Sequence, residues 1–359
     1  MIYAGIYMKI IFILPSMAGG GSERVVANLV NFYVNKGLEA AILMFASNEV
    51  TYELDSRVEV VQVGTKTNGN PLERIKRIKN MRKYFKQNEG CFIFSFNEMG
   101  AVFSVIAAMG IKHRLLVSER NDPRRIPFIQ RVLRDWAYAK ADCMVAQTED
   151  VVRMFSKKVQ SKSVVIPNPI SGDIPERHIG ERTKRIVNVA RLEPQKNHEL
   201  LIDAFAGFCV THNDYTLDIY GKGSLLSSLK ERALELQISD KVIFHGFSSD
   251  VKNEIRDASM FVLSSDYEGI SNSMVESLAM GIPTISTDCP VGGSKTFIQN
   301  GVNGLLVPIG DVTAMTEAMC RIADDNELAQ KFSNNSISIR TTCSIDKIAT
   351  DFLKAAGID

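Results

Sequence analysis

Two glutamates, eight residues apart, are the side chains in this sequence that most clearly suggest binding chemistry. Glu268 follows a short apolar run, and Glu276 is expected in the first turn of the next helix, which Asn272 or Ser273 would cap. Unpaired backbone N–H groups at a helix start attract anions. Here they belong to Gly269, Ile270, Ser271, Asn272 and Ser273. A ligand with central phosphates and hydroxyl groups on both sides would suit this pattern, although surface and capping carboxylates would also produce it.

Two cations lie close together after the first strand expected in the C-terminal half. Arg191 and Lys196 belong to the segment RLEPQK. Arginine binds phosphate through two parallel hydrogen bonds, and lysine adds a point charge. Such groups would stabilise the negative charge that grows on a departing nucleoside diphosphate. A solvated basic loop is the alternative interpretation.

A glycine-rich turn follows the first apolar run of the chain. Gly20 and Gly21 precede an expected helix, so a phosphate or an acceptor group could approach the backbone there. A structural tight turn is the alternative. The turn does not match GxGxxG, and the segment at 45–48 lacks the acidic residue that reads ribose in nicotinamide sites. Both absences disfavour a nicotinamide-dependent oxidoreductase.

Alternating strands and helices must position these residues. Apolar runs predict strands at 9–14, 40–45, 58–63, 92–96, 114–118 and 143–146, with helices at 22–35, 72–86 and 127–139. After a segment rich in proline and glycine at 164–181, the alternation restarts. We therefore predict an α/β fold of two Rossmann-like domains facing across a cleft, at 1–170 and 171–340. The remaining stretch, 341–359, carries a helix that is expected to return to the N-terminal domain.

The charge of the chain is unevenly distributed. Residues 1–180 hold 25 Lys and Arg against 17 Asp and Glu, and the remainder holds 17 against 24. The basic half should favour an anionic surface or substrate. Six scattered cysteines without metal-ligand spacing indicate reduced thiols and no zinc site. No stretch approaches the roughly 20 apolar residues that span a bilayer, and residues 1–7, which precede the start-like sequence MKII, are expected to have no functional part.

Together these segments resemble the retaining glycosyltransferases of family 4, which have the GT-B fold. The matching pieces are GGGSERVV, SERNDP, VIPNPI, VARLEPQKN, IYGKG, FHGF, EGISNSMVESLAMG, CPVGG and NGLLVP, and they follow the family's order over nearly the whole chain. The resemblance implies that Glu268 holds donor-sugar hydroxyls, Glu276 holds the ribose, and Arg191 and Lys196 bind the diphosphate. It also implies that Gly20 and Gly21 line the phosphate and acceptor region, that Gly246 and Phe247 border the base pocket, and that no metal is needed.

The sequence departs from the family's pattern at two places. Gly293, Ser294 and Lys295 stand where relatives often have proline, so the donor-sugar pocket is expected to have its own shape. Some relatives carry a histidine in the loop that here reads SERND, and this chain has none there. Glu119 is the substitute candidate for a catalytic group.

The basic half contains a strongly basic amphipathic segment at 72–86. Its apolar residues recur at helical spacing, and the other faces carry seven Lys and Arg against one Glu. Such helices lie on anionic lipid, although a helix packed on the core with a solvated basic face would look the same. A second basic run comprises Arg120, Arg124, Arg125, Arg131 and Arg134. We expect a peripheral enzyme at the inner face of the cell membrane, with a lipid-linked or glycan acceptor and no nucleic-acid partner.

The leading functional hypothesis is transfer of a hexose or N-acetylhexosamine from a nucleotide-sugar, with UDP favoured, in polysaccharide or glycoconjugate biosynthesis. Retention of anomeric configuration is implied by the resemblance alone. A catalytically silent nucleotide-sugar-binding protein is the first alternative, and a nicotinamide-dependent oxidoreductase is the second.

Overall fold

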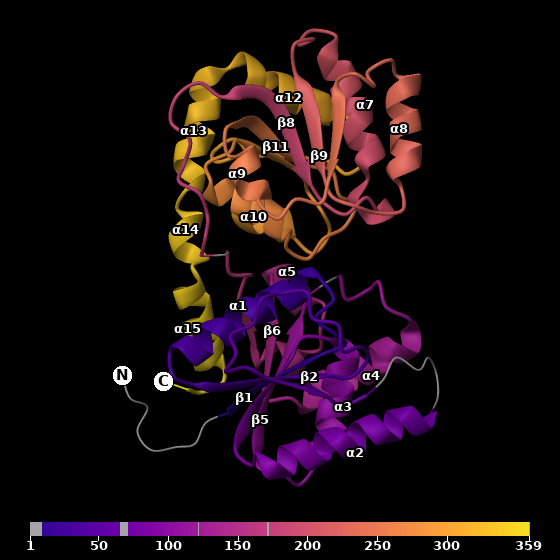
Figure 1. Cartoon of the computed structure of the whole chain (residues 1–359), viewed down its shortest axis with the longest axis vertical. Helices are drawn as coiled ribbons and strands as arrows, with labels where there is room; N and C mark the ends of the chain where they lie inside the picture. The colour runs from indigo at the N-terminus through magenta and orange to yellow at the C-terminus, as the bar shows by residue number, and fades with distance from the viewer. Residues whose placement is uncertain (1–8, 65–70, 121, 171, 359) are drawn as a thin grey trace. The chain divides into compact units, whose positions relative to one another are not determined.

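The structure is a computed structural model that describes residues 9–64, 71–120, 122–170 and 172–358. The expectation for residues 1–7 lies outside these ranges. The chain divides into two compact units (Figure 1). Unit 1 comprises Met1–Pro169 and Ile345–Asp359, and unit 2 comprises Ile170–Ser344. Each unit is described by itself below.

Unit 1 is built on seven parallel strands in the order β3-β2-β1-β4-β5-β6-β7. Strand β1 reads KIIFIL and is buried from Ile10 to Leu14, because helices cover both faces of a parallel sheet. The strands are β1 (Lys9–Leu14), β2 (Glu39–Met44), β3 (Glu59–Gln62), β4 (Cys91–Ser95), β5 (His113–Glu119), β6 (Cys143–Ala146) and β7 (Ser163–Val165). The helices are α1 (Gly21–Asn35), α2 (Pro71–Gln87), α3 (Glu98–Ala107), α4 (Phe128–Lys140), α5 (Glu149–Arg153), α6 (Lys157–Gln160) and α15 (Ile345–Ala355).

Unit 2 repeats this architecture with six parallel strands in the order β10-β9-β8-β11-β12-β13. The strands are β8 (Thr183–Val189), β9 (Thr216–Tyr220), β10 (Val242–Gly246), β11 (Ala258–Leu263), β12 (Thr284–Thr287) and β13 (Leu305–Val307). The helical elements are η1 (Pro194–Lys196), α7 (His198–Cys209), α8 (Leu226–Glu235), α9 (Val251–Ile255), α10 (Asn272–Ala279), α11 (Gly293–Phe297), α12 (Val312–Asp324), α13 (Asn326–Ser336) and α14 (Ile339–Thr342). The strand order reverses between β8 and β11, and ligands of doubly wound sheets bind at the carboxyl ends of the strands at this point.

The last helix of the chain, α15, belongs to the core of unit 1. Phe352 is buried beside Phe94 and Phe96, with ring centroids 6.0 and 5.7 Å away. The Tyr33 hydroxyl donates a hydrogen bond to the Ala349 carbonyl at 2.9 Å, and burial raises the pKa of Tyr33 well above its usual value. The predicted return of the C-terminal helix is therefore confirmed. The helix begins at Ile345, and residues 341–344 belong to unit 2.

Several elements were not predicted from the sequence. The segment EMGAVFSVIA forms α3 although it is apolar on nearly every face, so its helical period is weak. Strands β7 and β13 have three residues each and give little alternation to detect. No helix within the described residues is long and apolar enough to cross a membrane.

Candidate active site

The loop after β8 carries the two predicted cations and is held against the loop after β9. The Ala190 and Leu192 N–H groups donate to the carbonyls of Tyr220 and Lys222, both at 3.0 Å. A Cβ atom on Gly221 would lie 1.8 Å from the Ala190 carbonyl oxygen, and one on Gly223 would lie 2.2 Å from that of Leu192. The glycines of the IYGKG motif therefore permit two backbones to touch, and this contact fixes the loop that bears exposed Arg191.

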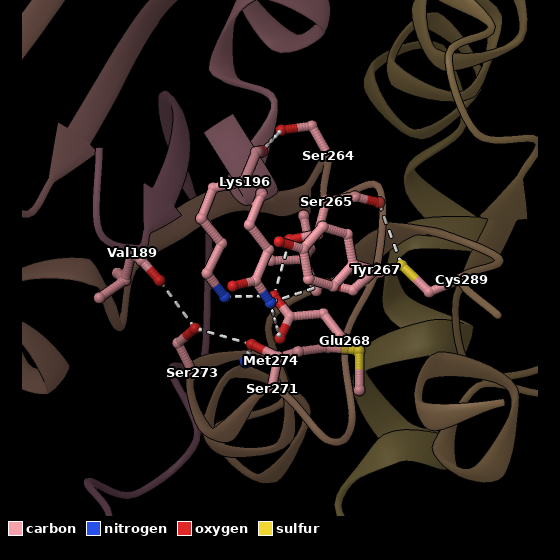
Figure 2. A network of polar contacts seen from close by, with 12 residues as sticks. Val189, Lys196, Ser264, Ser265, Tyr267, Glu268, Ser271, Ser273, Met274 and Cys289 are labelled. Atoms are coloured by element: carbon pink, nitrogen blue, oxygen red, sulfur yellow. Dashed lines mark hydrogen bonds and ion pairs between the residues drawn. The ribbon is translucent and has the colours of Figure 1, made fainter. Parts of the chain in front are cut away.

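Lys196 and Glu268 form an ion pair at the point where the strand order reverses (Figure 2). Lys196 follows β8 and Glu268 follows β11, and their side chains are 12% and 9% exposed. A lysine and a glutamate 72 residues apart thus share one site. The two residues were predicted as separate motifs, and the structure brings them together.

Hydrogen bonds between the two loops fix this pair. The Ser264 hydroxyl donates to the Lys196 carbonyl at 2.8 Å. The Asp266 N–H donates to the Gln195 carbonyl at 3.0 Å, and the Asn197 amide donates to Asp266 Oδ1 at 2.7 Å. Asn197 adopts a left-handed conformation with φ of 43°, which asparagine tolerates, and its side chain also caps α7. Lys196 is therefore placed by backbone and side-chain contacts on both sides.

The Glu268 carboxylate has further partners besides Lys196. The Ser265 hydroxyl donates to Oε1 at 2.8 Å (Figure 2). The Gln195 amide donates to the Tyr267 carbonyl at 2.8 Å and lies 3.5 Å from Oε2. Oε1 thus receives two donors whereas Oε2 has one long contact, so Oε2 is the oxygen better able to accept a ligand hydroxyl.

Helix α10 begins beside this carboxylate, and its start differs from the prediction. Ser271, not Asn272 or Ser273, is the N-cap, with its hydroxyl 3.5 Å from the Met274 N–H. Ser273 instead donates to the Val189 carbonyl at 2.8 Å, which anchors the helix start to the end of β8 (Figure 2). Glu276 is consequently the fifth helical residue rather than a first-turn residue, and it is 5% exposed. The predicted donors of Gly269 and Ile270 lie in the loop that leads into this helix.

The CPVGG segment packs beneath the same loop. A Cβ atom on Gly293 would lie 1.6 Å from the Gly269 carbonyl oxygen, so only glycine fits there. Val291 has a φ of 70°, a strained conformation for a β-branched residue that functional sites often retain. Cys289 donates to the Ser265 carbonyl at 3.0 Å, and burial raises the pKa of its thiol to about 12. The glycine in place of the family's proline pattern therefore supports the Glu268 loop through backbone contact.

Gly246 and Phe247 lie at the carboxyl end of β10, next to the loop after β9. The Gly221 N–H donates to the Gly246 carbonyl at 2.7 Å, and Gly246 has a φ of 74°. Phe247 is 72% exposed. An exposed aromatic ring at a strand's carboxyl end offers a flat apolar surface, and its place beside a base stays a prediction.

The remaining predicted site residues lie in unit 1 and are not brought together with Lys196 and Glu268 in one compact unit. Gly20 is the N-cap of α1 and accepts a hydrogen bond from the Tyr52 hydroxyl at 2.8 Å, while Gly21 is the first helical residue. Glu119 is 2% exposed. It lies 3.4 Å from the Tyr138 hydroxyl and 3.6 Å from Arg134 Nη1. These contacts favour a structural role for Glu119 over direct contact with a substrate.

Two members of the predicted basic run turn toward the interior of unit 1. Arg134 is 3% exposed and donates to the Pro123 carbonyl at 2.7 Å. Arg120 lies over the rings of Phe96 and Phe352, at 4.5 and 5.5 Å, and burial lowers its pKa to about 9. The second basic run therefore offers an anionic partner fewer charges than the sequence suggested, because charge along a sequence does not reveal which side chains point inward.

The chain matches two family models that together cover most of its length. The model for Glycosyltransferase Family 4 matches residues 19–173, and the model for Glycosyl transferases group 1 matches residues 172–338. Their meeting point coincides with the boundary between the two units.

Relatives of known activity match along the whole chain. Two are from Campylobacter jejuni. An N-acetylgalactosamine-N,N'-diacetylbacillosaminyl-diphospho-undecaprenol 4-alpha-N-acetylgalactosaminyltransferase is 27% identical over 96% of this chain and 98% of its own. An alpha-1,4-N-acetyl-D-galactosaminyltransferase that acts on a glycan linked to diphospho-undecaprenol is 28% identical over 97% and 98%.

A solved structure shares the fold. The Anabaena protein HepE, crystallised in complex with UDP, superposes with a TM-score of 0.83 at 15% identity, covering 98% of this chain and 100% of its own. These matches rule out the oxidoreductase alternative. The chain belongs to the GT-B glycosyltransferases, with a family 4 domain followed by a group 1 domain.

Proposed function

We propose that this enzyme transfers a hexose or an N-acetylhexosamine from a UDP-sugar to a lipid-linked glycan, with retention of configuration, in polysaccharide or glycoconjugate biosynthesis. The observation that carries the proposal is the Lys196–Glu268 pair, which lies beside the start of α10 at the reversal of strand order. A cation for phosphate and a carboxylate for hydroxyls are thus adjacent, as a nucleotide-sugar requires.

Each side chain has a role in this proposal. The Lys196 ammonium has three N–H donors, so it can keep Glu268 and still donate to a phosphate oxygen. Arg191 and the N–H groups from Gly269 to Asn272 bind the remaining phosphate oxygens. Glu268 Oε2 accepts a hydroxyl of the donor sugar, Glu276 accepts the ribose hydroxyls, and Gly246 and Phe247 border the uracil. Arg191 and Lys196 stabilise the departing diphosphate without a metal ion.

The acceptor side of the proposal rests on the relatives and on charge. Both Campylobacter relatives act on substrates linked to diphospho-undecaprenol, as their names state. Helix α2 presents a row of exposed basic residues that would attract an anionic membrane surface: Arg74, Lys76, Lys79, Lys83 and Lys86. Gly20 and Gly21 would contact the acceptor or the donor phosphates. The enzyme would then work peripherally at the inner face of the cell membrane.

Thermal stabilisation by candidate ligands is the first test of the donor. A ligand at 100 times its dissociation constant stabilises the folded state by about 2.7 kcal/mol. We expect UDP and one UDP-sugar to raise the melting temperature, and GDP, ADP and NAD(H) to leave it unchanged. Stabilisation by GDP or ADP alone would refute the UDP assignment.

Transfer itself is tested with a polyprenyl-diphosphate-linked saccharide as acceptor. We expect product with a retained anomeric configuration by NMR, at a rate that a chelator does not change. Binding of UDP-sugar without transfer to a panel of such acceptors would instead support the silent-binder alternative.

A further inference from the structure

Helix α4 turns its more apolar face away from the core of unit 1. Its buried residues are Arg134, Ala137 and Tyr138. The large apolar residues on the opposite face are exposed: Phe128 by 68%, Ile129 by 73%, Val132 by 51%, Leu133 by 38% and Trp136 by 37%. At about 100° per residue these five side chains fall within an arc of about 140°, so they form one continuous stripe.

Helix α2 also leaves apolar residues exposed. Leu72 and Ile75 are 72% and 50% exposed, and only Met81 and Phe85 of this helix are buried. Of the two interpretations of the segment, packing on the core therefore describes the C-terminal half of α2 and not its first half. A groove of about 480 Å³ joins the two helices, lined by Phe45, Met99, Phe103 and Ile129 with Arg74 and Arg77.

Basic residues border the apolar stripe at the groove, where Arg74 and Arg77 lie with Ile129 and Leu133. Arg74, Lys76 and Lys79 are exposed on α2, and Arg124 and Arg125 are exposed just before α4. The Arg131 guanidinium lies over the Phe128 ring at 5.5 Å. The acidic groups nearby are Glu73, Asp122, which pairs with Arg124, and Asp135, which pairs with Arg134. The excess of positive charge remains after these pairs are counted.

This combination identifies one occupant. Soluble monomers rarely leave so continuous an apolar patch uncovered. A second copy of the chain would bring one basic rim against another, which electrostatic repulsion opposes. An anionic bilayer offers both hydrocarbon for the stripe and negative charge for the rim, and tryptophan is favoured at the boundary between them. We propose that the exposed face of α4 inserts into an anionic lipid bilayer.

The inference rests on the proposed function, because a lipid-linked acceptor requires the enzyme at a membrane. It adds an inserted apolar element to the electrostatic attraction expected of α2. It also assigns insertion to a specific helix, α4. The sequence analysis named this helix only for the two arginines that it contributes to the second basic run.

Trp136 is the single tryptophan of the chain and lies on the proposed face, so its fluorescence reports insertion directly. The full-length protein is mixed with vesicles of equal parts phosphatidylcholine and phosphatidylglycerol. We expect co-sedimentation, a blue shift of Trp136 emission, and quenching by lipids brominated near the head of the acyl chain. Vesicles of phosphatidylcholine alone should bind at least about tenfold more weakly, because the basic rim loses its partner.

Two substitutions on the stripe are compared with a matched control. Ile129→Asp and Val132→Asp should each weaken vesicle binding at least about tenfold, because a charge is then forced into hydrocarbon. Val210→Asp alters an equally exposed apolar residue of unit 2, at 83% exposure, and should bind vesicles normally. All three variants should keep the urea unfolding midpoint of the unchanged protein, which shows that both units fold.

Three results would overturn the inference. Sedimentation with unchanged Trp136 emission would mean purely electrostatic attachment. Concentration-dependent dimers that Ile129→Asp dissolves would mean a contact between copies. Absence of vesicle binding in a protein that UDP still stabilises would refute insertion and leave the transferase proposal intact, whereas vesicle binding without any nucleotide stabilisation would refute the donor assignment instead.

Discussion

The Lys196–Glu268 pair predicts a specific pattern of effects on stability and activity. Lys196→Met removes the cation and leaves Glu268 with Ser265 and Gln195 as partners. Glu268→Gln removes the negative charge and leaves a nearly buried ammonium. Breaking a buried ion pair from one side costs 3–5 kcal/mol, typically, in free energy of unfolding. We expect each change to lower the free energy of unfolding by about 3 kcal/mol, the lower end of that range. The reason is that both side chains are still about a tenth exposed to solvent.

The double variant separates stability from catalysis. Removing both charges leaves no uncompensated buried charge. The double variant should therefore lose about 1.5–3 kcal/mol less free energy of unfolding than the sum of the two single losses. Transfer should not recover, because both groups act on the donor. Losing one electrostatic contact to a developing charge lowers kcat by about 10²–10³.

Urea unfolding and initial rates with saturating donor measure both quantities. An exposed pair in the same unit, Lys184 with Asp214, serves as control, and Lys184→Met should change neither stability nor rate appreciably. The reasoning would be refuted if the two stability losses added within about 0.5 kcal/mol, or if the double variant regained transfer.

Three further perturbations test other parts of the structure. Gly293→Ala must displace the Gly269 carbonyl and should abolish stabilisation by UDP while the chain still folds. Gly172→Ala is the control, because a Cβ atom there would have no atom within 4 Å. Normal UDP binding by Gly293→Ala would contradict the role of this contact. Burial lowers the pKa of His198 to about 4, so the unfolded chain binds more protons than the folded chain between pH 6.5 and 4. The free energy of unfolding should therefore decrease as the pH is lowered across that window, by up to about 3 kcal/mol. Urea unfolding of the His198→Gln variant should show a flatter pH dependence, and an identical slope would refute this. Phe352→Ala should destabilise unit 1 by about 3–5 kcal/mol and leave stabilisation by UDP unchanged, and a loss below about 1 kcal/mol would contradict its place in the core.

The donor-site motifs could be predicted because their chemistry is local in sequence. Lys196 and Glu268 each follow a buried strand, and the carboxyl ends of parallel strands meet at one edge, so their proximity follows from the fold. The helix cap was less predictable. Ser271, Asn272 and Ser273 all have capping side chains, and the choice depends on Ser273 being engaged by Val189 on another element.

The orientation of α4 could not be predicted from the sequence. Its periodicity shows that the helix has two unlike faces, and the usual rule turns the apolar one inward. Here the inward face carries Arg134, which pairs with Glu119 and donates a hydrogen bond to the Pro123 carbonyl. An inward arginine depends on groups contributed by other elements, and such groups are identified only once the tertiary structure is available.

The position of α15 has a consequence for how the chain is made. Unit 1 is split in the sequence, because its core includes Ile348, Phe352 and Leu353, which follow the whole of unit 2. The whole of unit 2 is synthesised in between, from a continuous stretch that contains all of its own strands. The emerging N-terminal sheet therefore leaves the apolar side of α1 and β4 uncovered while some 175 further residues pass through the ribosome. Unit 2 can complete its folding on the ribosome before α15 emerges, and unit 1 reaches its final stability only after α15 has emerged.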